Sequence, residues 1–166
     1  QLRPESRGFV GLKSTDATEH ALIQPNYLES EYDRKVMRDG VRLVRNIVGQ
    51  KALDPYRGAE VWPGADKQSD EAIDAWIREC AETIYHPVGT AKMGYDDMAV
   101  VDTKCRVRGV EGLRVVDASV MPTLVGGNTN APTIMIAEKI SDDMLGKAPL
   151  PAEDVRIAED SAANAA

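Results

Sequence analysis

The segment 131–145 constrains the fold of this chain more than any other, because its first part, TIMIA, is apolar nearly all round. Pro132 suits the first position of a helix, and Gly146 suits the position just after its end. A helix without a polar face must be covered by protein on all sides. The sequence therefore predicts a deeply buried helix over 131–145, followed by an Ala-, Pro- and acid-rich flexible tail over 147–166.

Three short apolar runs predict strands. The first two, GFVGL (8–12) and HALIQPNYL (20–28), are bounded by residues typical of turns. The third, LRVV (113–116), ends at Asp117 and predicts a strand buried on both faces, as in a parallel sheet. His20 lies in the second run without a metal-ligand cluster beside it, so we expect it to be solvated or at a strand edge.

Two segments show the period of amphipathic helices. The first, 31–49, has charged residues on its outer face and ends at a glycine. The second, 69–82, opens with Ser69, a preferred N-cap residue, and has acidic residues in its first turn. The positions expected to face the core recur at helical spacing. They are Met37, Val41, Val44 and Val48 in the first helix, and Ile73, Trp76, Ile77 and Cys80 in the second.

Composition and charge argue against several classes of function. The chain has 166 residues, of which 43% are hydrophobic, as in an ordinary globular domain. Its net charge of -7 argues against a nucleic-acid partner, which requires a basic face. No apolar run approaches the roughly 20 residues of a membrane span, and the first residues lack the pattern of a signal peptide. We therefore expect a cytoplasmic location.

The two cysteines and one tryptophan-containing loop have structural explanations. Cys80 and Cys105 have no clustered histidines or CxxC spacing, so we expect reduced thiols and no metal site. The segment 54–68 is a loop rich in proline, glycine and charge. Trp62 in this loop could face a substrate or anchor the loop on the core, and the second role is the commoner one for a loop aromatic residue.

Two other loops contain residues suited to chemistry. YHPVGTAKMG (85–94) contains His86, whose side chain can accept a proton near neutral pH. VGGNTNAPT (125–133) contains Asn128, whose amide can donate a hydrogen bond to a developing oxyanion, and it leads into a helix N-terminus that attracts an electron-rich atom. Spacing alone does not show that His86 and Asn128 meet. A structural and a catalytic role for His86 therefore both stay open.

Three stretches of the chain resemble the C-terminal signature of the GMC (glucose–methanol–choline) oxidoreductases. They are HPVGTAKMG, VVDTKCRVRGVEGLRVVDASVMPT and GNTNAPTIMIAEKISD. The likeness runs from about Leu2 to Leu145 and is greatest for the bacterial choline dehydrogenase and alcohol dehydrogenase branch. It implies an α+β fold: the C-terminal part of a two-domain FAD enzyme, with an antiparallel substrate-domain sheet, its helices, and a strand and helix that return to the FAD domain.

The resemblance also implies an activity. Such enzymes use FAD to oxidise a primary alcohol, choline-like or other, by moving hydride from the carbinol carbon to flavin N5. The histidine of the family's HPVGT motif falls on His86, which would accept the hydroxyl proton as general base. The second active-site position, histidine or asparagine in the family, falls on Asn128, which would hold the substrate oxygen by a hydrogen bond. The candidate FAD contacts are Asp117, Ala118, Asn130, Pro132 and Thr133.

A domain division follows from the same resemblance. Residues 1–105 would form a portion of the substrate-binding domain, and residues 106–146 would return to the FAD-binding domain with the strand 113–116 and the helix 131–145. Family members begin with a βαβ unit whose GxGxxG motif holds the FAD diphosphate, and that N-terminal half is absent here. The expected partners are that half, a small alcohol, and an electron acceptor such as O₂ or a quinone.

Two alternatives remain at this stage. Hydroxynitrile lyases of the same fold contain FAD but cleave cyanohydrins without net redox chemistry, and Asn128 in a choline-like pattern disfavours them. The chain could also be a non-catalytic fragment, against which the presence of both His86 and Asn128 argues.

Overall fold

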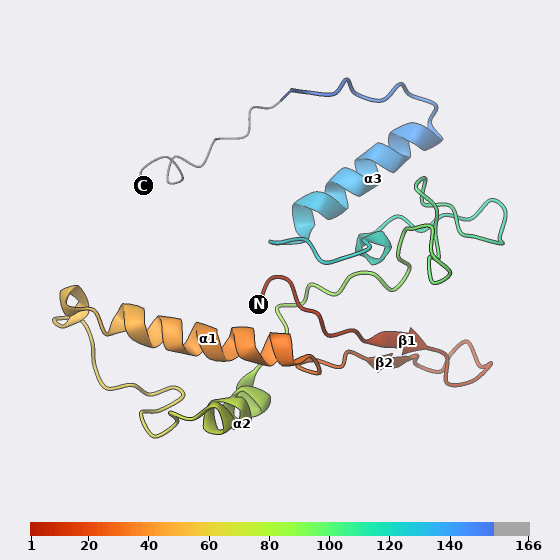
Figure 1. The fold of residues 1–166 in the computed structure, drawn as a ribbon. Coiled ribbons are helices and arrows are strands. Elements are labelled where there is room, and N and C mark those ends of the chain that lie inside the picture. The colour runs from red at the N-terminus through yellow and green to blue at the C-terminus, as the bar shows by residue number, and fades with distance from the viewer. Residues whose placement is uncertain (155–166) are drawn as a thin grey trace.

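The computed structural model describes residues 1–154 as two short strands and three α-helices, which confirms the predicted α+β class. In Figure 1, the strands lie with α1 and α2 in one part, and α3 lies with the loops before it in the other. Of the predicted tail 147–166, residues 147–154 are exposed and without regular structure, and residues 155–166 lie outside the described residues. Every helix in the described part is too short or too polar to span a bilayer.

The first two apolar runs contain the strands that the sequence predicted, and the structure shows that these strands pair as a hairpin. β1 (Phe9–Gly11) pairs antiparallel with β2 (Leu22–Gln24), and Val10 lies opposite Ile23. Gly8 is required just before β1, because a Cβ there would lie 2.2 Å from the carbonyl oxygen of Gln24. The side chains of both strands are largely exposed within residues 1–154, so this hairpin adds little to the core.

The apolar stripe predicted for α1 (Glu31–Val48) lies only partly in the core. Met37 is half-buried, but Val44 is 59% exposed. The buried residues of α1 are instead Asp33 and Arg38, which the hydrophobic period did not predict. The physical reason is that α2 lies beneath the first part of α1 only (Figure 1), so the apolar residues near the end of α1 have no helix against them in the described chain.

The two buried charges connect α1 to its neighbours. The guanidinium of Arg38 donates to Asp74 of α2 at 2.7 Å and to Glu31 at 2.6 Å. The carboxylate of Asp33 accepts hydrogen bonds from the first residues of the chain, including the N–H of Glu5 at 2.9 Å. A buried charge is costly unless it is paired or hydrogen-bonded. These contacts therefore specify how α1 lies against α2 and the N-terminal segment.

The helix α2 (Asp70–Cys80) confirms the second helical prediction. Ser69 is its N-cap, and the Ser69 hydroxyl accepts a hydrogen bond from the N–H of Ala72 at 3.2 Å. Ile73 and Ile77 are buried, as their spacing predicted. The helix thus packs through a short apolar stripe and leaves its other faces to charged residues.

The loop before α2 is anchored by an aromatic contact. The ring of Trp62 lies 6.3 Å from the ring of Trp76, and Trp62 remains 67% exposed, so the loop rests on α2 rather than in the core. A short 3₁₀ turn, η1 (Lys51–Leu53), leads into this loop.

Both cysteines are free, and Cys80 is half-buried where the pattern predicted burial. Burial raises the pKa of the Cys105 thiol, which makes it a poor nucleophile.

The second part of the molecule has an apolar core in which the predicted strand 113–116 does not form. Arg114 makes an isolated antiparallel bridge with Arg106, and the Val115 N–H donates to the Cys105 carbonyl at 3.1 Å. A strand needs a continuous ladder of partners, and residues 1–154 give this run a single isolated bridge. The core residues are Val101, Cys105, Val120 and Ile140, with Met93, Val107, Val115, Val116 and Ile136 packed around them.

The last helix, α3 (Asn130–Met144), begins one residue before the predicted start and is less buried than predicted. Ile140 is buried, but Ile134 is 53% exposed, because one face packs on the core and residues 1–154 provide nothing that covers the other. Its end matches the prediction. Gly146 has a φ of +68° and donates to the Asp143 carbonyl, and the next N–H donates to the Asp142 carbonyl, which is a Schellman motif.

Candidate functional site

The loop that carries His86 is joined to the turn that carries Asp117. The N–H of Ala91 donates to the Ser119 carbonyl at 3.0 Å, and the N–H of Met93 donates to the Val120 carbonyl at 2.8 Å. The structure therefore brings together two of the stretches that the sequence singled out, although they are far apart in the chain.

Tight backbone geometry gives this loop its path. Gly89 has a φ of +87°, and a Cβ there would lie 3.2 Å from the Met121 carbonyl oxygen. Tyr85, directly before the histidine, has a φ of +62°, which is uncommon for a residue other than glycine. The backbone on both sides of His86 is thus held in conformations that few residues adopt, and such conformations concentrate at functional sites.

His86 itself is half-buried and has an unused nitrogen. Its Nδ1 is buried and has no hydrogen-bond partner among residues 1–154. Leaving a buried polar atom unpaired costs free energy, so such an atom in a folded protein calls for an explanation. A neutral imidazole can donate at one nitrogen and accept at the other, so this ring has hydrogen-bonding capacity that the described residues do not use.

Asp117 has a local role in the same turn. Its side chain caps the 3₁₀ turn η2 (Ala118–Val120), with Oδ1 accepting the Ser119 N–H at 2.7 Å. Ala118 is half-buried. The carboxylate of Asp117 therefore shapes the turn that the His86 loop is bonded to, which the sequence alone did not predict.

The start of α3 presents backbone N–H groups that have no partner among residues 1–154. The N-cap residue Thr129 makes no side-chain capping bond, so the amides of Asn130 and Ala131 have no acceptor within the helix. Pro132 is the third helical residue rather than the first, and it has no N–H to satisfy. The N–H and hydroxyl of Thr133 both donate to the Thr129 carbonyl, at 3.1 and 2.6 Å. This helix end can accommodate an electron-rich group.

Asn128 is exposed in the loop before α3. No hydrogen bond joins it to His86 among residues 1–154, so the meeting of these two residues stays a prediction. The loop instead has a neighbour that sequence reasoning missed. A Cβ at Gly126 would lie 2.8 Å from Nη2 of Arg3, so the glycine leaves room for this guanidinium. The paired glycines were the available signal, but no sequence pattern indicates which side chain fills the space beside them.

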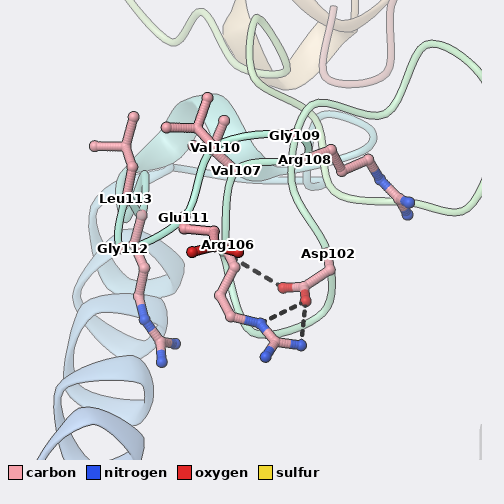
Figure 2. A pocket seen from close by; sticks show the side chains of 10 residues that line it. Asp102, Arg106, Val107, Arg108, Gly109, Val110, Glu111, Gly112 and Leu113 are labelled. Carbon is pink, nitrogen blue, oxygen red and sulfur yellow. Dashed lines mark hydrogen bonds and ion pairs between the residues drawn. The ribbon is translucent and has the colours of Figure 1, made fainter.

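A hollow of about 610 Å³ lies elsewhere, around the loop 106–114 (Figure 2). Hydrogen bonds from the side chain and backbone of Arg106 lower the pKa of Asp102 to about 2, so this carboxylate is ionised at neutral pH. None of the seven predicted site residues lines the hollow, which is formed by Asp102 and residues 106–114. Across residues 1–154 there is no group of three or more His, Cys, Asp or Glu that could hold a metal ion.

Comparison with curated proteins finds close relatives. The chain is 58% identical over 150 residues to an oxygen-dependent choline dehydrogenase of Pseudomonas savastanoi pv. phaseolicola, with 90% of this chain and 26% of the relative covered. It is 54% identical over 150 residues to the enzyme of that name from Cronobacter sakazakii, covering 90% and 27%. The chain thus spans about a quarter of the length of the curated relatives it matches.

Solved structures show the same likeness. The chain superposes on pyridoxine 4-oxidase from Mesorbium loti with a TM-score of 0.81 and 33% identity, over 89% of this chain and 29% of that one. An FAD-dependent oxidoreductase from Chaetomium thermophilum matches with a TM-score of 0.81 and 30% identity, over 89% and 26%. The second of these neighbours is named as FAD-dependent, which agrees with the cofactor predicted from the family resemblance. A family model described as GMC oxidoreductase matches residues 4–137, and the chain therefore belongs to the GMC oxidoreductase family.

Proposed function

We propose that this chain forms the C-terminal part of an FAD-dependent enzyme that oxidises a small primary alcohol, with choline as the first candidate. The support is its similarity to proteins named oxygen-dependent choline dehydrogenase. The active protein would include the N-terminal FAD-binding half, and it would pass electrons to O₂ or a quinone-like acceptor. In this arrangement residues 1–105 belong to the substrate-binding domain and residues 106–146 to the FAD-binding domain.

The residues present are compatible with a flavin beside the start of α3. The amides of Asn130 and Ala131, which have no partner among residues 1–154, would face an electron-rich part of the cofactor, and the positive end of the helix would favour negative charge there. The proposed contacts are Asp117, Ala118, Asn130, Pro132 and Thr133. When bound, FAD supplies the acceptor for the hydride of the carbinol carbon.

The observation that carries the proposal is that the half-buried ring of His86 has hydrogen-bonding capacity that residues 1–154 leave unused, its buried Nδ1 included. In the proposed role, the imidazole accepts the hydroxyl proton of the alcohol as its carbinol C–H bond breaks. Its loop is bonded to the Asp117 turn, so the ring is held in place on the side of the chain proposed to lie against FAD. Asn128 would donate its amide hydrogen to the substrate oxygen as negative charge develops there.

The test is the substitution His86→Ala in the complete FAD-containing enzyme, with choline and an artificial electron acceptor. Loss of a general base reduces turnover by about 10²–10⁴-fold, and the flavin content should not change. His20→Ala is the matched control, since His20 is the only other histidine in the chain and lies exposed in the N-terminal hairpin. We expect its turnover to equal that of the unmodified enzyme.

Two results would contradict the proposal. A His86→Ala enzyme with unchanged turnover would exclude the histidine as the base. Substrate consumption without reduction of any acceptor would indicate lyase chemistry in place of alcohol oxidation.

A further inference from the structure

The first residues of the chain lie against the loop that carries Asn128. A Cβ built on Gly126 would lie 2.8 Å from Nη2, 3.1 Å from Nε and 3.2 Å from Cζ of Arg3. Three atoms of one planar group at nearly equal distances mean that the guanidinium faces the Gly126 backbone. Any side chain at this position would displace the guanidinium, so the contact depends on the glycine.

Arg3 is exposed, but residues on both sides of it in the chain bond to the buried carboxylate of Asp33. Gln1 donates to Oδ1 of Asp33 at 3.0 Å, and the N–H groups of Glu5 and Ser6 donate to Oδ1 and Oδ2 at 2.9 and 2.8 Å. The Ser6 hydroxyl also donates to Oδ2. Because Asp33 is 2% exposed and lies on α1, these bonds fix the backbone of the N-terminal segment to a rigid helix.

The loop beside Arg3 needs such support. Two consecutive glycines, Gly126 and Gly127, precede Asn128, and glycine has more accessible backbone conformations than any other residue. Asn128 is exposed, and its amide must be oriented to donate a hydrogen bond. A catalytic donor works only when its geometry is set in advance of the reaction.

We propose that Arg3 is a positioning residue for Asn128: its guanidinium packs on Gly126 and restricts the flexible backbone that carries the oxygen-binding amide. This inference rests on the proposed function, because it assigns Arg3 an effect on turnover through Asn128. The charge of Arg3 does not take part in proton transfer. The planar shape of the guanidinium is what packs on the peptide, and lysine lacks it.

The experiment is a double-mutant cycle in the complete FAD-containing enzyme, with Arg3→Ala, Asn128→Ala and the double variant. We expect Arg3→Ala to lower kcat roughly 10-fold. This is less than the rate loss of about 10²-fold that can follow when a catalytic group is displaced by about 1 Å. Asn128→Ala should lower it by about 10²–10³-fold. If Arg3 acts through Asn128, the double variant has the same kcat as Asn128→Ala alone, because there is no amide left to position.

Three further variants make the test specific. Gly126→Ala places a Cβ where the guanidinium lies, so it should reproduce the effect of Arg3→Ala without removing the arginine. Arg3→Lys keeps the charge but should behave like Arg3→Ala. Arg7→Ala is the control, because among residues 1–154 the Arg7 side chain donates only to the Pro4 and Ser6 carbonyls of its own segment, at 2.8 and 3.0 Å, and its kcat should not change.

The outcomes separate this inference from the proposed function. Additive losses in the double variant, or unchanged kcat in Arg3→Ala or Arg3→Lys, would overturn the role of Arg3 and leave that of Asn128 intact. Unchanged kcat in Asn128→Ala would overturn both roles. Flavin absorbance of each purified variant shows whether it is folded, and if Arg3→Ala does not fold, Gly126→Ala gives the same comparison.

Discussion

The two parts of the molecule are stabilised by different kinds of contact. In the part that contains α1 and α2, the two buried charges of α1 are fixed by directional bonds, Arg38 to Asp74 of α2 and Asp33 to the amides that follow Pro4. Only Ile73 and Ile77 of α2 are buried apolar side chains among the described residues of these two helices. In the part that contains α3, the fully buried side chains are apolar, and Val101 and Ile140 lie in one cluster. Charged contacts specify orientation, whereas apolar burial supplies most of the stabilising free energy.

This difference has a physical consequence. Hydrogen bonds with Asp74 and Glu31 raise the pKa of Arg38 above its usual value, so the guanidinium stays charged in the buried site. The attraction within a buried ion pair offsets little more than the free energy needed to remove both charges from water. Asp33 is bonded to uncharged N–H and O–H donors, so we expect its substitution to reduce stability less than a cavity in the apolar core, and the following predictions test that order.

The largest effect is expected for Ile140→Ala in the apolar core. Ile140 is 5% exposed, and removing a buried isoleucine side chain costs about 2–5 kcal/mol because a cavity remains. Urea unfolding followed by circular dichroism measures the change. The exposed Glu138 on the same helix gives the control, Glu138→Ala, which should alter the free energy of unfolding by less than about 0.5 kcal/mol. A loss for Ile140→Ala no larger than that of its control would contradict the importance of this core.

A smaller and pH-dependent effect is expected for Asp33→Asn. Burial of the Asp33 carboxyl opposes ionisation, but hydrogen bonds from Ser6 and from the Glu5 N–H outweigh it and hold the pKa of Asp33 below its usual value. The ionised form therefore stabilises the fold above about pH 4, and this contribution is lost as the pH falls through the lowered pKa. Hydrogen bonds to charged groups contribute about 2 kcal/mol.

Urea unfolding at a series of pH values checks this prediction. The free energy of unfolding of Asp33→Asn should be lower than that of the unmodified chain at pH 7, and the gap should narrow below about pH 4. Asp97→Asn, at an exposed position, is a control that removes one carboxylate without touching the N-terminal segment. If the difference in unfolding free energy between Asp33→Asn and the unmodified chain were the same at all pH values, ionisation of Asp33 would not contribute to stability.

The smallest effect compares the N-termini of two helices. Ser69 caps α2 with its side chain, so Ser69→Ala should reduce the free energy of unfolding by about 1 kcal/mol. Thr129 at the start of α3 makes no side-chain capping bond, so Thr129→Ala should cost less. Thermal unfolding of the two variants measures the difference. Equal losses in the free energy of unfolding would show that the Thr129 side chain stabilises the start of α3 as much as the Ser69 side chain stabilises the start of α2.

Features that depend on a few neighbouring residues could be predicted from the sequence. The extents of α1 and α2, the Ser69 cap and the glycine stop of α3 all follow from local hydrogen bonding and helical period. The run 113–116 was predicted as a strand and is not one, because a strand depends on partners that local pattern does not reveal. The burial of α3 was also overestimated, since apolar composition does not show which faces are covered.

The candidate site divides in the same way. His86 and Asn128 could be singled out from their residue types and motifs, because proton acceptance and hydrogen-bond donation belong to the side chains themselves. Three features could not be predicted from the sequence. They are the hydrogen bonds between the His86 loop and the Asp117 turn, the lack of a partner for His86 Nδ1 among residues 1–154, and the contact of Arg3 with Gly126. The sequence by itself determined the chemistry available and the helices that carry it. Only the tertiary structure decided which distant segments meet, because those contacts depend on how all the elements pack at once.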